Sequence, residues 1–489
     1  MSTRHTARPA ERAFPSHRLR FGLPARLGLL AAAGTAVLVL ALLMLPGDDG
    51  GRGPVVPPTA SVKPSDAATP TTVPTPRATA TVTPAPTPTP TPTPTPIPPS
   101  WTALEWSDAV VPFPYVPPQR AGEQGRRVTI NDVIEWNGQY VGVGAVDDTL
   151  ACSAAGFLTS ADGLSWDIGQ LVASGDDRTP TMCPRFVVPV GDALFAIAQE
   201  RIWRSADGVS WTELDASSLR SIWSGRGEEL IDVAASPDGI VIIGKPMNTN
   251  DSIVAFSPDG ATWATSELPA SGTAIARDAT VHHGGFVIVG RDGEPDGSGS
   301  PAEPYTHPGV GSPAAWTSSD GATWSQAAVE GRSVTGGTMT QVLAGAGGLF
   351  AIGNDADLRR QYEEVDGIGV AAWHSADGRR WARSGLLDDV APGAALLASD
   401  GVDMVAVAAS RDVSISSDGL RWSRVTVSGE LRVPAYLMYP LSVREASALS
   451  AYDIEVWATG GGLLASYTVG SPEGFAIKQL QLGRPTNAD

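Results

Sequence analysis

The sequence has few of the residues and motifs that usually mark an enzyme. Its 489 residues include two cysteines, six histidines and eight tyrosines. It contains no G-x-S-x-G elbow, no H-E-x-x-H pair and no glycine-rich phosphate loop. No histidine lies within a few positions of either cysteine, which argues against a Cys/His metal site. We therefore expect no metal, no cofactor and no assignable catalytic residue.

Positive charge is also scarce beyond the N-terminus. The chain has 34 Lys and Arg against 52 Asp and Glu, a net charge of −18. The first 26 residues hold six arginines and one glutamate, so they carry +5 and the remainder carries −23. A body this acidic argues against nucleic acid or an anionic membrane surface as a partner. It suits solubility outside a cell, or a basic partner.

Charge is absent from residues 27–45, a 19-residue apolar run. That length matches one bilayer crossing. Arginines precede the run and Asp48-Asp49 follow it, so the positive-inside rule places residues 1–26 in the cytoplasm. A cleaved signal peptide is the alternative, but the run is long and no clear A-x-A site follows it. We favour an uncleaved signal anchor in the cell membrane, single-pass, with the C-terminal body extracellular.

Residues 46–100 read as a linker. Thr87 to Pro96 is almost pure Thr-Pro alternation within a longer stretch of Pro, Thr, Ala and Val. Proline fixes φ and removes backbone donors, so this stretch is expected to be disordered or extended polyproline II without a core. The remaining residues, 101–489, are expected to form the folded body.

That body is organised by a seven-residue pattern, S-x-D-G-x-x-W, which occurs six times. Successive tryptophans are 45, 52, 61, 57 and 41 residues apart, a spacing that indicates an array of similar supersecondary units. A worn seventh copy is Ser471 to Ile477. The fixed positions of the six copies are Ser160, Asp162, Gly163, Trp166; Ser205, Asp207, Gly208, Trp211; Ser257, Asp259, Gly260, Trp263; Ser318, Asp320, Gly321, Trp324; Ser375, Asp377, Gly378, Trp381; and Ser416, Asp418, Gly419, Trp422.

Each fixed position has a physical reason to be there. Asp-Gly between apolar runs predicts a type I′ hairpin turn, with positive φ at both central residues. The Ser hydroxyl and the Asp carboxylate can each accept a hydrogen bond from a backbone N–H two residues on. The Trp is large enough to wedge between neighbouring sheets. We therefore interpret these aspartates as structural staples of turns and not as catalysts.

The pattern resembles the Asp-box, or BNR, repeat (Ser-x-Asp-x-Gly-x-Thr-Trp) of sialidases, sortilin-type receptors and xyloglucanases. All six copies here lack the residue between Asp and Gly, as in a shorter variant found in extracellular BNR-like repeat proteins without assigned chemistry. The resemblance covers residues 101–489. It implies a β-propeller with each box between the third and fourth strands of a blade.

Short apolar runs separated by turns predict four strands in each of seven units, and so an all-β, seven-bladed propeller. An open solenoid is the alternative; closure is favoured because capping repeats are not evident. In the last unit we expect strands at 445–450, 454–459 and 463–469. The ring closes either with residues 101–111 or with residues 477–482, and the sequence leaves both open.

The two cysteines, Cys152 and Cys183, fall in connections that a propeller places on one face. An exported chain permits disulfides, so we predict that they pair. Closing a loop of this length stabilises by roughly 3 to 4 kcal/mol. Two separate thiols are the alternative.

Long insertions distinguish the fourth and fifth units. Residues 291–312 and 354–369 fall between the second and third strands, so both should emerge from one face of adjacent blades. Function concentrates on loops that a rigid scaffold displays, although a purely solvated insertion is the alternative. The chemistry-bearing side chains there, our candidate binding residues for a protein or glycan, are Tyr305, His307, Arg359, Arg360, Tyr362, Glu363 and Glu364.

Two other groups of residues are weaker candidates for metal ligands. Asp355, Asp357, Glu364 and Asp366 are suitable calcium ligands, but they do not follow the EF-hand pattern. His282 and His283 are adjacent on a predicted strand and should point to opposite faces, which makes joint ligation improbable.

Two functions from different classes remain. The favoured one is a surface-displayed binding or scaffold module without catalytic activity. The rival is a cell-surface glycoside hydrolase, sialidase-like, or a lyase. Sialidases carry a Phe/Tyr-Arg-Ile-Pro signature before the first boxes, whereas Pro184-Arg185-Phe186-Val187 here is scrambled and follows the first box. Convergent arginines or paired carboxylates in a central pocket would favour the enzyme.

Overall fold

The protein is described here from a computed structural model. It divides into two units, Met1–Pro90 and Thr91–Asp489, and every described residue belongs to the second. The described residues are 102–111, 127–147, 152–173, 183–223, 229–245, 252–293, 311–330, 337–355, 371–386, 394–408, 410–432, 454–459, 462–470 and 476–486.

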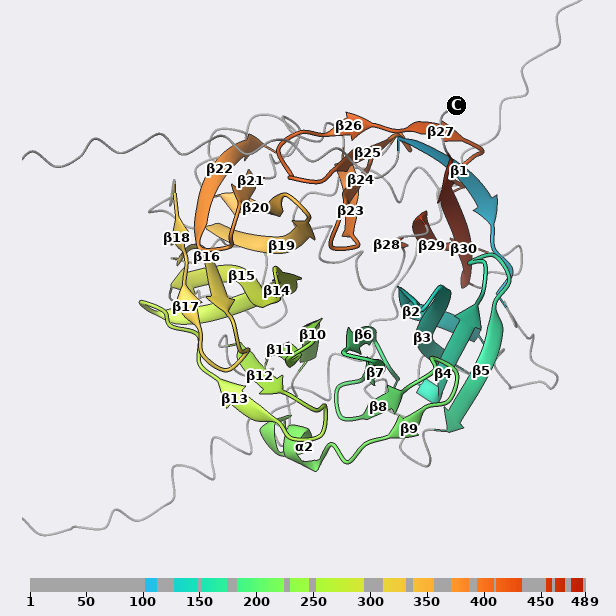
Figure 1. Ribbon diagram of the computed structural model, residues 1–489, viewed down its shortest axis with the longest axis horizontal. Coiled ribbons are helices and arrows are strands. Elements are labelled where there is room, and N and C mark those ends of the chain that lie inside the picture. The colour runs from blue at the N-terminus through green and yellow to red at the C-terminus, as the bar shows by residue number, and fades with distance from the viewer. Residues whose placement is uncertain are drawn as a thin grey trace, which may run out of the picture. The chain divides into compact units, whose positions relative to one another are not determined.

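Seven antiparallel sheets stand around a common centre, with the first strand of each sheet innermost (Figure 1). Blade 1 contains β2 (Arg127–Trp136), β3 (Gln139–Asp147), β4 (Cys152–Ser160) and β5 (Asp167–Ala173). Blade 2 contains β6 (Phe186–Val190), β7 (Ala193–Ile197), β8 (Ile202–Ser205) and β9 (Thr212–Glu213). Blade 3 contains β10 (Glu229–Ser236), β11 (Gly239–Lys245), β12 (Ile253–Ser257) and β13 (Ala264–Ser266).

The next three blades repeat this order. Blade 4 contains β14 (Thr273–His282), β15 (Gly285–Gly293), β16 (Gly311–Ser318) and β17 (Ser325–Gln326). Blade 5 contains β19 (Gly337–Gly345), β20 (Gly348–Asp355), β21 (Ala371–Ser375) and β22 (Arg380–Leu386). Blade 6 contains β23 (Ala394–Ser399), β24 (Met404–Ala408), β25 (Val413–Ser416) and β26 (Ser423–Arg424). The prediction of an all-β, seven-bladed propeller is thus confirmed.

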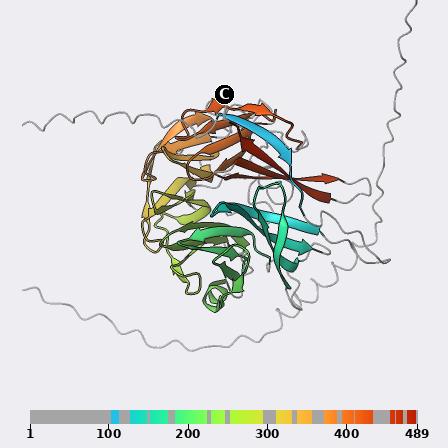
Figure 2. The same ribbon diagram turned by 45° about the vertical axis from the view of Figure 1, so that its right-hand side comes forward.

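Blade 7 closes the ring with strands from both ends of the body. Its sheet runs β28 (Ile454–Thr459), β29 (Gly462–Gly470), β30 (Ala476–Pro485) and then β1 (Ala103–Asp108). β1 pairs antiparallel with β30, and the two lie side by side in both views (Figures 1 and 2). Both closing segments that the sequence left open are therefore used, as the third and fourth strands.

This closure corrects the predicted strand order of the last unit. The strand at 454–459 is the innermost of the sheet, not the second, and 463–469 lies in the second strand, not the third. Residues 445–450, the expected first strand, lie outside the described residues. The worn seventh box falls between the second and third strands, so it does not occupy a box position. Three local strands suffice because the N-terminal segment supplies the fourth.

Two short strands extend the outer edge of their neighbours. β27 (Thr426–Ser428), which follows blade 6, pairs parallel with β1 of blade 7. β18 (Ala328–Val329), which follows blade 4, pairs parallel with β22 of blade 5. An isolated parallel bridge joins Val110 to Ser165 in the same manner. At the first two junctions the chain leaving one blade is hydrogen-bonded to the outer strand of the next, and at the third it is bonded to the box that precedes this strand.

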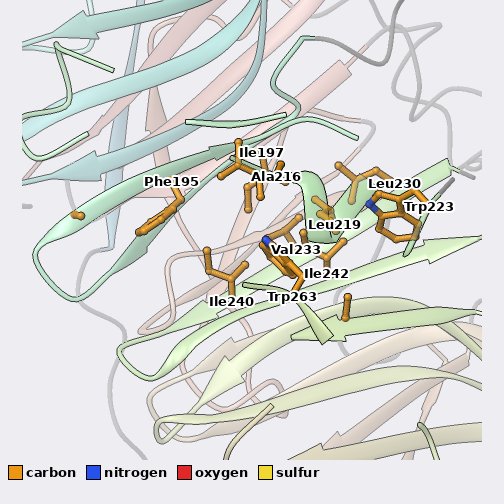
Figure 3. Packing of buried hydrophobic residues seen from close by; sticks show 13 residues of the cluster. Phe195, Ile197, Ala216, Leu219, Trp223, Leu230, Val233, Ile240, Ile242 and Trp263 are labelled. Atoms are coloured by element: carbon orange, nitrogen blue, oxygen red, sulfur yellow. The ribbon is translucent and has the colours of Figure 1, made fainter. Parts of the chain in front are cut away.

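The hydrophobic core lies between blades. Each of the seven main clusters of buried residues draws on two neighbouring sheets. Figure 3 shows the cluster between blades 2 and 3, where Phe195 and Ile197 face Ile240 and Ile242. A short helix that the sequence pattern did not predict, α2 (Ser217–Trp223), adds Leu219 and Trp223 to this cluster.

Alternation of the strands gives the propeller two distinct ends. The turns between first and second strands share one end with the boxes, and we call it the box end. The connections between second and third strands, and those between blades, lie at the opposite, loop end. Contacts across blade boundaries agree with this arrangement: the Gln139 amide of blade 1 donates to the Asp207 carbonyl in the box of blade 2 (2.8 Å).

Candidate functional site: two sets of aspartates

The boxes contain the predicted hydrogen bonds from amides two residues on, and they add bonds from amides three residues on. In the second copy, the Ser205 hydroxyl oxygen accepts from the Gly208 amide (2.8 Å), and Asp207 Oδ1 accepts from the amides of Val209 (2.9 Å) and Ser210 (2.7 Å). The pair of amides that donate to the aspartate recurs in all six copies. Each aspartate therefore stabilises its own turn.

The turn type at the boxes differs from the prediction. Only the glycine of each box has positive φ, between 69° and 75°, and the aspartate does not. Type I′ geometry occurs instead at two turns between first and second strands, Asn137-Gly138 (52°, 76°) and His283-Gly284 (50°, 80°). The Asp carboxylate of a box accepts hydrogen bonds from the amides two and three residues ahead, and a two-residue hairpin loop does not place both amides within reach. The box is therefore a wider turn.

Box glycines and tryptophans join neighbouring blades. The indole nitrogen of each box Trp donates to the carbonyl of its box Gly at 2.8–3.1 Å. Trp211 of blade 2 stacks on Phe157 of blade 1, with ring centroids 4.7 Å apart. A Cβ at Gly260 would lie 2.4 Å from the ring of Phe195 in the preceding blade. The boxes thus act as wedges between sheets, as their sequence suggested.

In four boxes these hydrogen bonds favour the ionised form of the carboxylate. The pKa values of Asp162, Asp207, Asp259 and Asp320 are lowered, first of all by the backbone amides that donate to them. A group that donates a proton in catalysis needs the opposite shift at neutral pH. The box aspartates are consequently poor candidates for general acids.

The two adjacent histidines do not point to opposite faces as we expected. β14 ends at His282, and His283 occupies the turn with φ of 50°, so the alternation of a strand no longer applies. Their ring centroids are 3.9 Å apart. His282 Nε2 lies 3.3 Å from the Ala376 carbonyl oxygen in the box of blade 5, a contact between blades. Among the described residues, no group of three or more potential ligands is arranged to hold a metal ion.

A second set of polar residues lies on the innermost strands and was not predicted. In blades 1, 3, 4, 5 and 6 the pairing of the first two strands shifts register at one position. Such a shift is a β-bulge, which redirects the side chains that follow it. In four of these blades the next residue is polar: Asp132, Asp232, Asp278 and Gln341. In blade 4 glycine is required opposite the bulge, since a Cβ at Gly290 would meet the Ile275 carbonyl oxygen at 1.9 Å.

The side chains after the bulges bond to the innermost strand of the next blade, and we call them inner latches. The backbone amides of Val187, Ala279 and Val342 donate to the carboxylates of Asp132 (2.8 Å), Asp232 (2.6 Å) and Asp278 (2.6 Å), respectively. The Gln341 amide donates to the Leu397 carbonyl (3.4 Å). Arg185, within the scrambled sialidase-like stretch, donates to the Leu230 carbonyl (2.9 Å) and so spans blades 2 and 3.

Two of the inner latches are hydrogen-bonded to each other. The carboxyl groups of Asp232 on β10 and Asp278 on β14 form a pair that is enclosed by protein, although each residue is partly exposed as a whole. Burial raises the pKa of both, and for Asp278 the charge of Asp232 adds to the increase. A direct bond between two carboxyl groups requires one proton, and the stronger increase in pKa is that of Asp278.

This pair does not have the geometry of a glycosidase. Retaining and inverting glycosidases hold their carboxyl groups about 5 to 9.5 Å apart, so that a sugar or water fits between them. Directly hydrogen-bonded carboxyls are much closer, and these also accept backbone amides. The sequence did contain a signal for the inner latches: a polar residue stands five positions before the first turn of blades 1, 3, 4 and 5.

The candidate binding residues lie outside the described residues, so their placement stays untested. These are Tyr305, His307, Arg359, Arg360, Tyr362, Glu363 and Glu364. The flanking strands are described: β15 ends at Gly293 and β16 begins at Gly311, while β20 ends at Asp355 and β21 begins at Ala371. Both connections therefore start and finish at the loop end of adjacent blades. The strands also extend into both expected insertions, which makes each of them shorter than predicted.

The predicted disulfide is tested only in part. Cys183 is buried, and its sulfur lies 3.5 Å from the carbonyl oxygen of Ala154, two residues along β4 from Cys152. No cysteine among the described side chains is a free thiol. The side chain of Cys152 is outside that set, so its pairing with Cys183 stays a prediction. Peptide mapping without reductant should recover the two cysteines in one linked fragment; two unlinked thiol peptides would contradict it.

Comparison with known proteins supports no closer assignment than the fold. No family model and no curated protein matches the sequence. A Dyadobacter fermentans protein of unknown function is 14% identical with a TM-score of 0.35, covering 74% of this chain and 95% of that one. The Trypanosoma rangeli sialidase is 13% identical with a TM-score of 0.36, covering 78% and 58%. The Neurospora crassa Pan2 WD40 domain is 12% identical with a TM-score of 0.39, covering 80% and 97%. The seven-bladed propeller is established by the chain's own strand pairing, and these distant matches assign no function to it.

Proposed function

We propose that the chain is a membrane-anchored, extracytoplasmic propeller that binds a partner and does not catalyse a reaction. The main support is that the carboxylates described above accept backbone hydrogen bonds and so stabilise the scaffold. The box aspartates accept hydrogen bonds from backbone amides within their own turns, and the three aspartates among the inner latches accept them from amides of the next blade. Groups so engaged stabilise the scaffold, which leaves the loop end as the region where the blades differ most.

The anchor is part of this proposal. No helix within the described residues is long and apolar enough to cross a membrane, and residues 27–45 are not among them. Their length and flanking charges support a signal anchor with residues 1–26 in the cytoplasm. Residues 46–100 would then separate the propeller from the membrane. Protease protection in spheroplasts tests this arrangement: the body should be digested from outside while the N-terminal tail is protected.

The partner, a protein or a glycan, is proposed to meet the loop end of blades 4 and 5. Tyr305 and Tyr362 offer amphipathic rings that favour interfaces, and Arg359 and Arg360 offer charge. Pro, Gly and charged residues dominate residues 294–310, so this segment contributes little to a hydrophobic core.

A loop replacement tests the partner site. Substituting residues 294–310 by a short Gly-Ser turn keeps Gly293 and Gly311, which pair at the ends of β15 and β16. The full-length variant should retain its thermal midpoint and lose partners that co-purify with the native chain. A scrambled segment of equal length and composition is the matched control for sequence-specific contact. Intact binding in a destabilised variant would show that the loop is structural.

The hydrolase or lyase alternative is tested separately. Turnover of aryl glycosides by the purified chain would favour it, and the purified Asp278→Asn variant would show whether the carboxyl pair takes part. Loss of turnover without loss of folding would assign chemistry to the inner wall and overturn the proposal.

A further inference from the structure

We propose that Asp232 and Asp278 form a proton-sharing clasp that joins the innermost strands of blades 3, 4 and 5 and weakens as the pH rises. Three consecutive contacts define the clasp. The Ala279 amide on β14 donates to Asp232, the two carboxyl groups bond to each other, and the Val342 amide on β19 donates to Asp278. β10, β14 and β19 are thereby connected through two side chains.

The clasp contains a single proton shared between two carboxyl groups. A bond between two carboxyl groups needs one donor, and both carboxylates also accept backbone amides. Asp278 donates to Asp232, so Asp278 is neutral and Asp232 carries the charge. The Arg185 guanidinium, which precedes β6 in blade 2, acts on Asp232 and favours this assignment.

The other neighbours add little charge. From β19 the pair receives the backbone amide of Val342, and the adjacent latch residue Gln341 is neutral. Arg277 precedes Asp278 on β14 and is the other charged side chain beside the pair in sequence. The environment therefore supports one negative charge at the clasp. A second negative charge would face the first in an enclosed site, where repulsion between like charges is strong.

The direction of the pH effect follows from the raised pKa of Asp278. Above the ordinary aspartate value of 3.8, the unfolded chain has released this proton while the folded chain still holds it. In that window the folded state binds more protons, so the clasp's contribution to stability falls as pH rises. Once Asp278 ionises, releasing its proton to solvent, the hydrogen bond between the carboxyls is lost.

The decisive variants are Asp278→Asn and Gln341→Ala, each made in the full-length chain. Asparagine has an N–H donor and a carbonyl acceptor, so it copies the protonated acid but does not titrate. Gln341 is an inner latch at the equivalent position of blade 5 without an ionisable group, which makes it the matched control.

Thermal midpoints between pH 4.5 and pH 8 give the first readout. The thermal midpoint of Asp278→Asn minus that of the wild type should rise with pH, by on the order of 2 °C across the range, because only the wild type loses the clasp. Gln341→Ala should lower the midpoint by a constant amount throughout. A flat difference for Asp278→Asn, or the same slope for Gln341→Ala, would overturn the proposal.

Infrared spectroscopy gives a readout that does not depend on the Asn variant folding. At pH 6 ordinary carboxyl groups are ionised, so the carbonyl band of a protonated acid should come from Asp278 in the wild type. Asp232→Asn removes the neighbouring charge, and the same band should then titrate away at lower pH. No protonated-acid band in the wild type at pH 6, or a band that Asp232→Asn does not shift, would refute the shared proton.

Discussion

The box aspartates and the inner-latch aspartates on the innermost strands (the inner wall) both accept hydrogen bonds from backbone amides, but they do so in opposite surroundings. Asp259 in a box accepts the amides of Ala261 and Thr262 near solvent, and its pKa is lowered. Asp278 on the inner wall accepts the amide of Val342 beside a second carboxyl group, and its pKa is raised. Donated amides favour the carboxylate, while burial and a like charge favour the acid. The surroundings, not the residue type, decide whether the folded protein favours the ionised or the protonated aspartate.

The two regions also differ in where their stability comes from. At the boxes the carboxylate accompanies a buried indole that fills the junction between blades, whereas an inner latch has no such ring within its own motif. Hydrophobic burial should therefore dominate at the boxes, and polar bonds should dominate on the inner wall.

Trp381→Ala should have the largest effect. Its side chain is fully buried in the cluster between blades 4 and 5, and truncating such a ring costs about 3–5 kcal/mol. Trp422 occupies the same box position in blade 6 but is only partly buried, so Trp422→Ala is the matched control and should cost less. Chemical denaturation of both full-length variants measures the difference. Equal losses would show that burial does not set the contribution of the box tryptophan.

Asp259→Ala should have a smaller effect, about 1–2 kcal/mol. Removing the carboxylate leaves two amides of the turn without their acceptor, as when a helix cap is lost. Pro258→Ala, at the exposed neighbouring position, should be close to neutral. A loss at Asp259 as large as that at Trp381 would mean that the carboxylate, and not the indole, is the main stabilising group of the box.

Much of the fold was predictable because its signals are local. Asn137-Gly138 between the apolar runs 128–136 and 140–146 predicts the first hairpin, and β2 and β3 end within about a residue of those runs. The order of blade 7 was not predictable in the same way. Residues 101–111 were one of the two expected closing segments, but the local pattern did not show that both segments are used, with β1 paired to β30 as the fourth strand.

The polar groups were harder to predict than the strands. Asp-Gly at a box and Asn-Gly at a hairpin look alike in sequence, yet the amides available to the carboxylate make the two turns different. The alternation rule takes no account of a bulge, so it could not predict which way Asp278 points. Its partner Asp232 is 46 positions earlier, and only the ring brings them together.

The smallest expected effect concerns acid unfolding at the boxes. The pKa of Asp259 is lowered, chiefly by the Thr262 amide, so in acid the unfolded chain binds its proton before the folded chain does. The unfolded state holds more protons there, and stability falls as the pH drops below the ordinary value of 3.8. Asparagine can still accept the amides but cannot titrate, so Asp259→Asn should make the decline of the denaturation midpoint below pH 4 slightly shallower. The same variant should leave the profile above pH 5 unchanged, where Asp278→Asn is expected to act. If Asp259→Asn altered the denaturation midpoint above pH 5 instead, the box and inner-wall aspartates would not act in separate pH ranges. The contrast between their pKa shifts would then be wrong.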